Sequence, residues 1–157
     1  MRKLLISLIA IAALGTGGVF AQSGFWAGVS GGYPGAQVHF GVENVFPNLD
    51  VRGNLGFSYF GLVGVGTGLG IGADVLYNLD VDTGMVPIDV YVGGGPNIAI
   101  GAVALGFSID AFVGGEYRLG ELNLPEGGVF LELGPAIRIM PAFTAGFVGR
   151  AGFNWHF

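Results

Sequence analysis

Residues 150–157 read Arg-Ala-Gly-Phe-Asn-Trp-His-Phe, and the interpretation of the whole chain depends on this stretch. Its odd positions carry Ala, Phe, Trp and Phe, whereas its even positions carry Arg, Gly, Asn and His. A period of two predicts a β-strand with one apolar and one polar face. The sequence then stops on an aromatic residue, Phe157, without a polar tail. An edge strand of a soluble β-sandwich is the competing explanation, so the rest of the chain has to decide.

The same alternation recurs along the chain and predicts an all-β protein with about eight strands in an antiparallel, up-and-down meander. In the segment 49–58, for example, apolar side chains alternate with Asp50, Arg52 and Asn54. Glycine, proline and asparagine at 94–97 predict a bend in the chain at that point. The expected strands are 25–32, 36–45, 49–58, 65–79, 86–94, 102–119, 128–140 and 145–157.

The composition separates a membrane barrel from a soluble one. Charged residues make up only 11% of the chain and the mean hydropathy is +0.66, whereas a soluble surface carries about 25–35% charged positions. The polar faces are therefore too poor in charge for a soluble, lipocalin-like exterior. A closed transmembrane β-barrel, with its aliphatic face toward lipid, suits them better. The net charge of −5 argues against a nucleic-acid partner.

The N-terminal segment 1–21 has the features of a secretory signal peptide. Arg2 and Lys3 precede an apolar run from Leu4 to Leu14, which is too short for a helix that needs about 20 residues to span a bilayer. Residues 22–157 would then form the outer-membrane β-barrel as one domain. Cysteine is absent, so export does not serve a disulfide framework.

The last strand also resembles the C-terminal signal of bacterial outer-membrane β-barrels, because Arg150, Gly152, Trp155 and Phe157 occupy its polar, glycine, apolar and terminal aromatic places. The chain as a whole resembles the small eight-stranded outer-membrane proteins, the OmpA/OmpX-like barrels. This resemblance implies insertion in outer-membrane lipid and recognition of the last strand by the barrel-assembly machinery. It also implies that the turns at 33–35, 59–64, 94–100 and 141–144 face outward.

Charged residues on the inward face predict a structural network in the lumen, because an unpaired charge in a narrow interior is costly. Antiparallel registers predict that Arg52 lies near Glu43 and Asp74, and that Arg150 lies near Glu132. The remaining predicted pair joins Arg138 to Asp110.

Neither the glycine run nor the histidines predict catalysis or a cofactor. The glycines at 64–72 fit no phosphate-binding motif, and their period of two predicts a bare inner wall facing a bulky residue such as Tyr91. His39 and Glu43 share a strand face near Ser30 and Ser58, as in a lipid-modifying barrel enzyme, but all would point inward. No G-x-S-x-G motif is present, and two histidines with this spacing do not predict a metal site.

Two functions remain open. The first is a non-enzymatic structural, anchoring or envelope-integrity role with the lumen plugged by side chains, and the alternative is a narrow porin-like channel. The two functions are distinguished by whether the lumen contains a continuous path. The side chains expected to fill the lumen are Trp26, Tyr91, Phe112, Phe130 and the Arg–acid pairs. Aromatic residues at the predicted outer turns suggest a contact surface for another envelope protein, or equally a girdle in the headgroup layer. They are Tyr33, Tyr59, Phe60 and Phe143.

Overall fold

The computed structural model describes residues 24–58, 68–81, 84, 86–101 and 105–157, so the predicted signal segment 1–21 lies outside the described residues. This part of the chain forms strands β1 (Phe25–Tyr33), β2 (Gly35–Phe46), β3 (Leu49–Ser58), β4 (Gly68–Leu79), β5 (Ile88–Gly101), β6 (Leu105–Arg118), β7 (Gly127–Met140) and β8 (Thr144–His156). A short 3-10 helix, η2 (Leu119–Leu122), lies between β6 and β7. No helix in the described ranges is long and apolar enough to cross a membrane.

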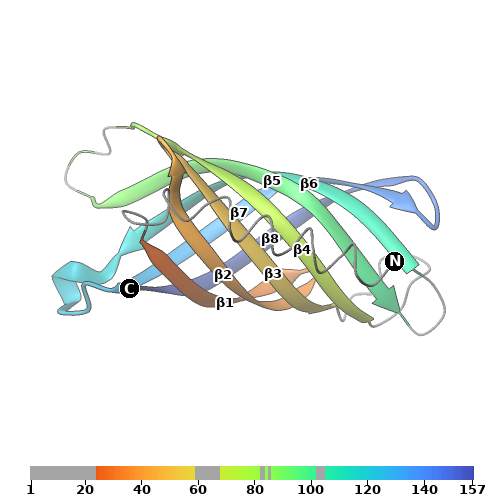
Figure 1. The fold of residues 1–157 in the computed structure, drawn as a ribbon, viewed down its shortest axis with the longest axis horizontal. Helices are drawn as coiled ribbons and strands as arrows, with labels where there is room; N and C mark the ends of the chain where they lie inside the picture. The colour runs from red at the N-terminus through yellow and green to blue at the C-terminus, as the bar shows by residue number, and fades with distance from the viewer. Residues whose placement is uncertain (1–23, 59–67, 82–83, 85, 102–104) are drawn as a thin grey trace, which may run out of the picture.

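The eight strands close into a barrel in chain order, each antiparallel to its neighbours (Figure 1). Closure is made by β1 and β8, which pair from Trp26 opposite His156 to Tyr33 opposite Gly149. The backbone therefore has no free sheet edge, which is the condition for placing β-structure in lipid. The predicted fold class, an all-antiparallel up-and-down barrel of eight strands, is confirmed.

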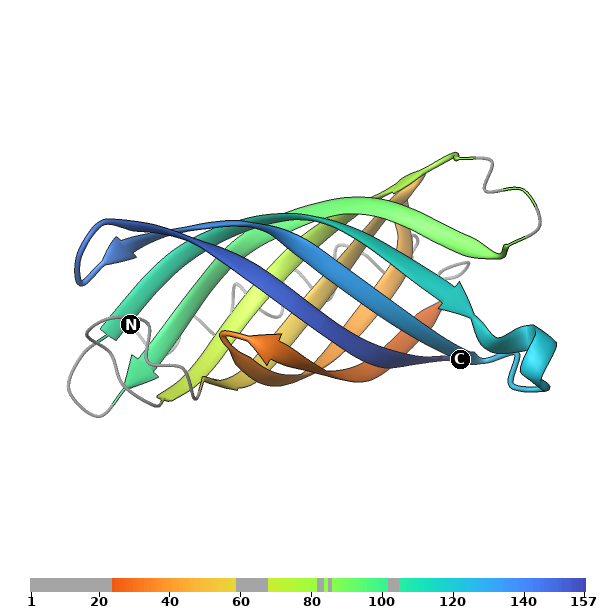
Figure 2. The same ribbon diagram turned by 180° about the vertical axis from the view of Figure 1, so that it is seen from behind.

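The two ends of the barrel differ (Figures 1 and 2). We call the end that carries the C-terminus, η2 and the β4–β5 connection the inner end, and the opposite end the outer end. The β7–β8 hairpin projects at the outer end, further along the barrel axis than the β1–β2 turn. An even number of strands places the beginning of β1 and the end of β8 at the same end.

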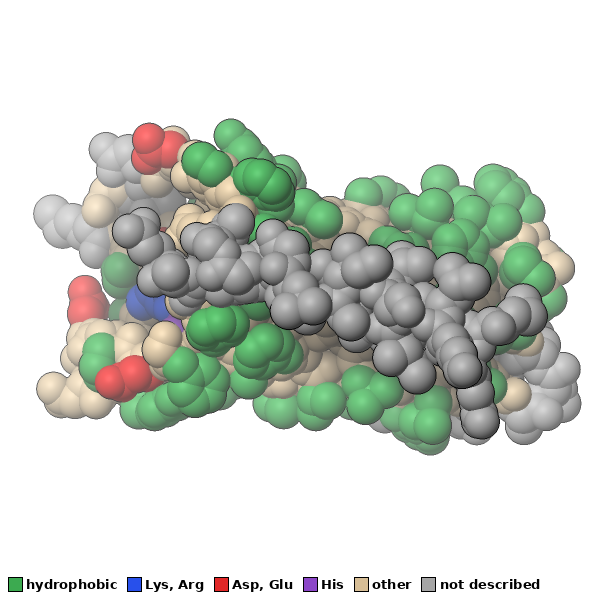
Figure 3. Space-filling model, in the orientation of Figure 1, with side chains coloured by type: hydrophobic (Ala, Val, Ile, Leu, Met, Phe, Trp, Pro, Cys, Tyr) green, Lys and Arg blue, Asp and Glu red, His purple; other side chains and the backbone are tan. Residues whose placement is uncertain are grey.

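Side-chain polarity is inverted relative to a soluble protein. Large aliphatic and aromatic residues cover the outside of the barrel, where green side chains follow the wall in Figure 3. Buried charged and polar residues, in contrast, outnumber the buried apolar ones. On β3, for example, Leu55 is 56% exposed, whereas Arg52 is 1% and Asn54 is 6% exposed. The alternation predicted from the sequence therefore has its apolar face outside.

One strand was predicted wrongly. The chain does not bend at Gly94–Asn97 but runs straight through it as part of β5, and the β5–β6 connection comes only after Gly101. Gly95 explains this, because a Cβ at that position would lie 1.8 Å from the backbone oxygen of Ala73 on β4. Glycine therefore permits a close approach of two strands here rather than a turn.

Candidate functional site

The centre of the lumen holds a layer of four charged side chains from four strands: Arg52, Asp74, Glu132 and Arg150 (the charge layer). Arg52 donates from Nη2 to Asp74 Oδ2 at 2.7 Å and from Nη1 to Glu132 Oε1 at 2.6 Å. Arg150 donates from Nε to Glu132 Oε2 and from Nη2 to Asp74 Oδ2, the latter at 3.3 Å. Each cation thus contacts both anions, and the layer links β3 and β4 to β7 and β8 across the lumen.

Burial makes this layer energetically demanding. Arg52, Asp74 and Glu132 are each 1% exposed. Ion pairs this deeply buried are tolerated only when further hydrogen bonds satisfy the charged groups. Two neighbours supply them: Tyr91 Oη donates to Glu132 Oε1 and Asn54 Nδ2 donates to Asp74 Oδ2, both at 2.8 Å.

Aromatic rings enclose the two arginines. The guanidinium carbon of Arg150 lies 4.7 Å from the ring centroid of Phe112, and that of Arg52 lies 5.3 Å from it. The ring of Trp26 is 6.0 Å from Arg52. These distances are within the range of cation–π attraction, which strengthens when the cation is shielded from water.

Four buried aromatic residues also lie over glycines on the neighbouring strand. A Cβ added at each glycine would fall within about 2.1–2.7 Å of the ring that covers it. In every case the glycine is the direct cross-strand partner of the aromatic residue. The pairs are Trp26 over Gly41, Tyr91 over Gly114, Phe112 over Gly93, and Phe130 over Gly152. The expectation that Tyr91 faces the glycine wall of β4 was therefore wrong, because Tyr91 covers Gly114 on β6 instead.

The charge layer and the rings divide the lumen into two cavities. The outer cavity has a volume of about 270 Å³ and extends from Arg150 to Tyr33 and Thr144. The inner cavity has a volume of about 380 Å³ and extends from Arg52 to Asp80 and Arg118. No residue lines both cavities. Arg150 lines the outer cavity and Arg52 lines the inner one, so the charge layer lies between the two cavities.

The structure brings together part of the predicted charge network. Arg52 contacts Asp74, and Arg150 contacts Glu132, as their cross-strand registers suggest. The contacts of Arg52 with Glu132 and of Tyr91 with Glu132 were not predicted, because these residues approach one another across the lumen rather than along a strand pair.

Glu43 does not contact Arg52, which corrects the prediction. The β2–β3 register shifts between Val42 and Phe46, with Asn44 at a positive φ of 51°. This irregularity carries Glu43 to the inner end, where its Oε1 lies 2.7 Å from His156 Nδ1.

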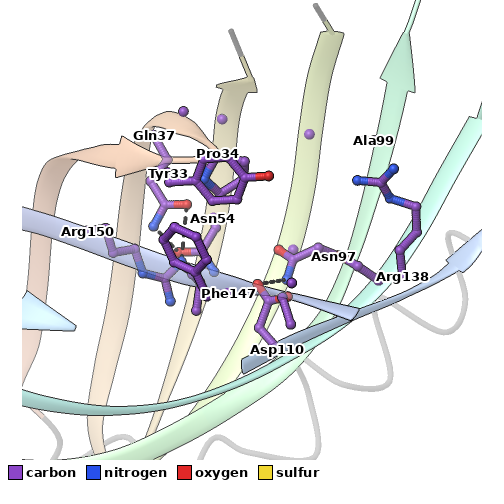
Figure 4. A pocket seen from close by; sticks show the side chains of 18 of the residues that line it. Tyr33, Pro34, Gln37, Asn54, Asn97, Ala99, Asp110, Arg138, Phe147 and Arg150 are labelled. Carbon is purple, nitrogen blue, oxygen red and sulfur yellow. Dashed lines mark hydrogen bonds between the residues drawn. The ribbon is translucent and has the colours of Figure 1, made fainter. Parts of the chain in front are cut away.

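Arg138 and Asp110 do not form the predicted ion pair either. In the regular β6–β7 register, Arg138 lies opposite Ser108 and Asp110 lies opposite Ala136, so the two charged residues are two positions apart along the strands. Asp110 instead accepts a hydrogen bond from Asn97 Nδ2 at 2.9 Å. Both residues line the outer cavity, and the arginine side chain extends away from the carboxylate (Figure 4).

A second polar cluster closes the inner end. Both ring nitrogens of His156 lie 2.7 Å from carboxylate oxygens, one of Glu43 and one of Glu116. Asn154 Nδ2 donates to Glu116 Oε2 at 2.5 Å, and its Oδ1 lies 2.8 Å from His39 Nε2. His39 thus contacts an amide and not a carboxylate, unlike the histidine of a catalytic triad. Among the described residues, no group of His, Cys, Asp and Glu could hold a metal ion.

The remaining predicted residues lie on the outer surface or at the ends. Trp155 faces outward at 37% exposure, and Phe157 donates its backbone N–H to Phe25 O at 2.8 Å. Tyr33 stacks on Phe147 with 4.8 Å between ring centroids, while Phe143 is 75% exposed. Tyr59 and Phe60 lie outside the described residues.

Comparisons with known proteins show the class of fold. No protein-family model and no curated protein match the sequence. The N-terminal β-barrel domain of Pseudomonas aeruginosa OprF is similar in structure, with a TM-score of 0.54 and 12% identity, over 86% of this chain and 96% of that one. Neisserial surface protein A has a TM-score of 0.47 and 13% identity, over 85% of this chain and 92% of its own. The fold is thus that of a small eight-stranded barrel such as the OprF barrel domain.

Proposed function

We propose that this protein is a non-enzymatic β-barrel of the bacterial outer membrane, with a plugged lumen and a structural, anchoring or envelope-integrity role. The buried charge layer is the observation that carries the proposal. It is buried in the lumen, each of its cations is hydrogen-bonded to both of its anions, and it lies between the two cavities.

Membrane insertion is supported by the outer surface. Exposed aliphatic side chains such as Leu69, Leu131 and Leu133, at 59–65% exposure, would be unfavourable in water over so large an area. In a bilayer the same surface would contact acyl chains, and the closed antiparallel ladder of the described strands pairs backbone groups that an open sheet edge would leave facing lipid. A strand of 12 residues, such as β4, is long enough to span the hydrocarbon core at a tilt.

A narrow channel is the second candidate, and one observation favours it. The cavities reach the charge layer from both sides, at Arg150 and at Arg52, so only a thin layer of side chains separates them. A water path would require at least one of these arginines to leave its two carboxylates. We place the plugged barrel first because each cation in that layer contacts both anions.

The anchoring role is a proposal about the outer end. The tip of the β7–β8 hairpin presents Met140 and Phe143, at 48% and 75% exposure, without a charged residue between them. If this tip docks on another envelope protein, Phe143→Ser should release that partner in mild detergent while heat-modifiable gel mobility stays normal. If the wild-type barrel always purifies alone from native membranes, this would instead support the alternative that the aromatic residues form a girdle in the headgroup layer.

Cell fractionation tests the membrane assignment. We expect the protein in the outer-membrane fraction, resistant to extraction by carbonate, and migrating differently on gels before and after boiling. Recovery as a soluble periplasmic protein would contradict the proposal.

A further inference from the structure

We propose that His156 is an imidazolium cation that forms an ionic clasp across the seam between β1 and β8, and that the clasp is complete only while the ring keeps both of its protons. The inference goes beyond the proposed structural role, since it concerns the protonation state of one side chain and requires only the folded barrel. It rests on the contacts of the ring, on the charges around it and on the place of β8 in the barrel.

Both nitrogens of the His156 ring face a carboxylate. Nδ1 lies 2.7 Å from Glu43 Oε1, and Nε2 lies 2.7 Å from Glu116 Oε1. An ionised carboxylate only accepts hydrogen bonds, so each ring nitrogen has to carry a hydrogen in order to bond to it. A neutral imidazole has a single N–H, whereas an imidazolium has two. The geometry therefore fits the charged ring, with both of its hydrogens donated.

The groups around the two glutamates favour a proton on the histidine over a proton on either carboxyl group. A neutral ring would form the same two contacts only if one of the carboxyl groups carried the proton instead. Glu116 accepts a hydrogen bond from Asn154 Nδ2 at 2.5 Å, and Arg118 Nε lies 3.5 Å from Glu116 Oε1. Arg118 Nη2 lies 3.8 Å from Glu43 Oε1. These donors stabilise the ionised form of both carboxylates, so the proton resides on the ring.

The inner cavity has too few cations to compensate its acids without this ring. Of its two arginines, Arg52 is engaged in the charge layer, and Arg118 is shared among three of the acids. Figure 3 shows basic and histidine side chains recessed between acidic ones at this end. The titratable groups that line the cavity with His156 are Arg52, Arg118, Tyr91 and the acids Glu43, Asp50, Asp80, Asp89 and Glu116. A positive ring therefore reduces the excess of negative charge enclosed here.

His39, the second histidine of the chain, has the opposite arrangement and provides an internal comparison. Its Nε2 lies 2.8 Å from Asn154 Oδ1. The amide nitrogen of Asn154 donates to Glu116, so its oxygen is the acceptor for His39, and Nε2 of His39 carries a hydrogen. Nδ1 of His39 is buried without a hydrogen-bond partner among the described residues. A second proton would be buried there without an acceptor, so the geometry fits a neutral ring.

The position of His156 gives the clasp its consequence. β8 closes the barrel against β1, and His156 lies opposite Trp26 in that strand pair. Glu43 belongs to β2 and Glu116 to β6, so the ring contacts the strands that lie one beyond each neighbour of β8. The side chain thereby connects the two sides of the seam at the inner end, in addition to the backbone ladder. Loss of a ring proton removes one of the two contacts.

Nitrogen NMR of the full chain, folded in detergent with isotope-labelled histidine, tests the charge. The shifts of the two ring nitrogens distinguish an imidazolium from a neutral imidazole, and replacement of either histidine by Gln assigns the signals. At about pH 7.5 an unperturbed histidine is mostly neutral. At this pH we expect His156 to be an imidazolium and His39 to be neutral. A neutral His156 in the wild-type protein would overturn the proposal, and this result does not depend on any variant folding.

A matched pair of substitutions tests the partners of the ring. Glu116→Gln removes one of the two charges that the ring contacts, so at about pH 7.5 the imidazolium fraction of His156 should fall to less than half of the wild-type value. Asp89→Asn is the control, because Asp89 contacts Arg118 rather than the ring, and it should leave the fraction unchanged. Equal fractions in wild type and in Glu116→Gln would contradict the clasp.

Hydrogen exchange tests the effect on the seam. The backbone N–H of Phe157 donates to Phe25 O at 2.8 Å and reports on the inner end of the β1–β8 pair. At about pH 6, where the ring of the wild type carries both protons, this amide should exchange several-fold faster in His156→Gln. Amides of β3 and β4 should stay as protected as in wild type. Exchange of the Phe157 amide at the same rate in both proteins would overturn the clasp.

The pH dependence of unfolding tests the role of the proton. The contribution of the imidazolium is complete at low pH and is lost as the pH rises and the folded protein releases the proton. The difference in urea midpoint between wild type and His156→Gln should therefore shrink by at least half from about pH 6 to about pH 10. If the protein proves soluble, the proposed membrane role fails while this test still decides on the clasp. A difference that stays constant over this range would overturn the dependence on the proton.

Discussion

Glu132 is the residue on which the charge layer depends most. It accepts hydrogen bonds from Arg52, Arg150 and Tyr91, while Asp74 is the only other anion of the layer. Without the Glu132 carboxylate, two buried guanidinium groups would share a single counter-charge. Breaking a buried ion pair from one side is far more costly than the net contribution of the intact pair, because it leaves charge buried and uncompensated.

We therefore expect Glu132→Gln to lower the free energy of unfolding by about 3–5 kcal/mol. Glu121→Gln is the matched control, since Glu121 is exposed on η2 and its hydrogen bond to Tyr117 lies at the surface, so the change should stay within about 0.5 kcal/mol. Urea unfolding in detergent, followed by tryptophan fluorescence, measures both. Equal midpoints for the two variants would show that the layer contributes little.

The ring-covered glycines give a second prediction at this scale. A Cβ at Gly152 would lie 2.3 Å from Val29 O and 2.6 Å from the Phe130 ring, so Gly152→Ala should destabilise the barrel by about 1–3 kcal/mol through overpacking. Gly146→Ala on the same strand is the control, because nothing lies within 4 Å of its Cβ. The same urea titration measures the stability of both variants. A Gly152→Ala variant as stable as the Gly146→Ala variant would contradict the close packing at Gly152.

Residues that face each other on adjacent strands could be predicted from the sequence, whereas contacts across the lumen could not. Strand order and register alone predict two contacts, that of Arg52 with Asp74 and that of Arg150 with Glu132. The contact between Arg52 and Glu132 also depends on the barrel's diameter and strand stagger, which the alternation of polar and apolar residues does not specify. A register shift in the β2–β3 pair displaces Glu43 and accounts for the missing Arg52–Glu43 pair. Arg138 and Asp110 do not pair because the β6–β7 register sets them two positions apart, which alternation alone does not specify.

At the scale of single elements, alternation predicted strands better than glycine and proline predicted turns. The bounds of β3 are those predicted, because its polar and apolar residues alternate throughout. β5 was shortened in the prediction, because Gly94–Asn97 resembles a turn in composition. In this barrel, glycine also serves inward positions that a ring or another backbone approaches closely, so it is an ambiguous turn signal.

The last strand closes the barrel, which gives a prediction about β8. Phe157 extends its ladder by one hydrogen bond to Phe25, and Trp155 presents its ring outward. If the barrel-assembly machinery recognises this end of β8, deletion of Phe157 or the substitution Phe157→Asp should reduce the amount of inserted barrel several-fold. Export should proceed normally in both variants. Phe157→Tyr is the control, since it keeps the aromatic ring. Membrane levels of the deleted form equal to wild type would contradict an assembly signal.

For the whole molecule, polarity pattern and closure determine the fold more than residue identity does. The OprF barrel domain shares this architecture at 12% identity. Low identity is compatible with one fold, because outward positions in contact with lipid would accept any aliphatic side chain, and the backbone ladder supplies its own hydrogen bonds. The lumen is under tighter constraint, since its volume must be filled and its charges compensated. The features that distinguish this protein from other small barrels are therefore expected among its inward-facing residues.

The plugged lumen that we propose leads to a prediction about conductance. An eight-stranded barrel is just wide enough for its side chains to fill it, and here four charged groups fix one another at the centre. Ion passage would require Arg52 or Arg150 to give up contacts to two buried carboxylates, at a cost of several kcal/mol. Purified protein in a planar bilayer should therefore show no reproducible single-channel steps, even at high salt. Regular steps from the wild-type barrel would favour the narrow channel, and their loss in Gly70→Leu would place the ion path through the outer cavity.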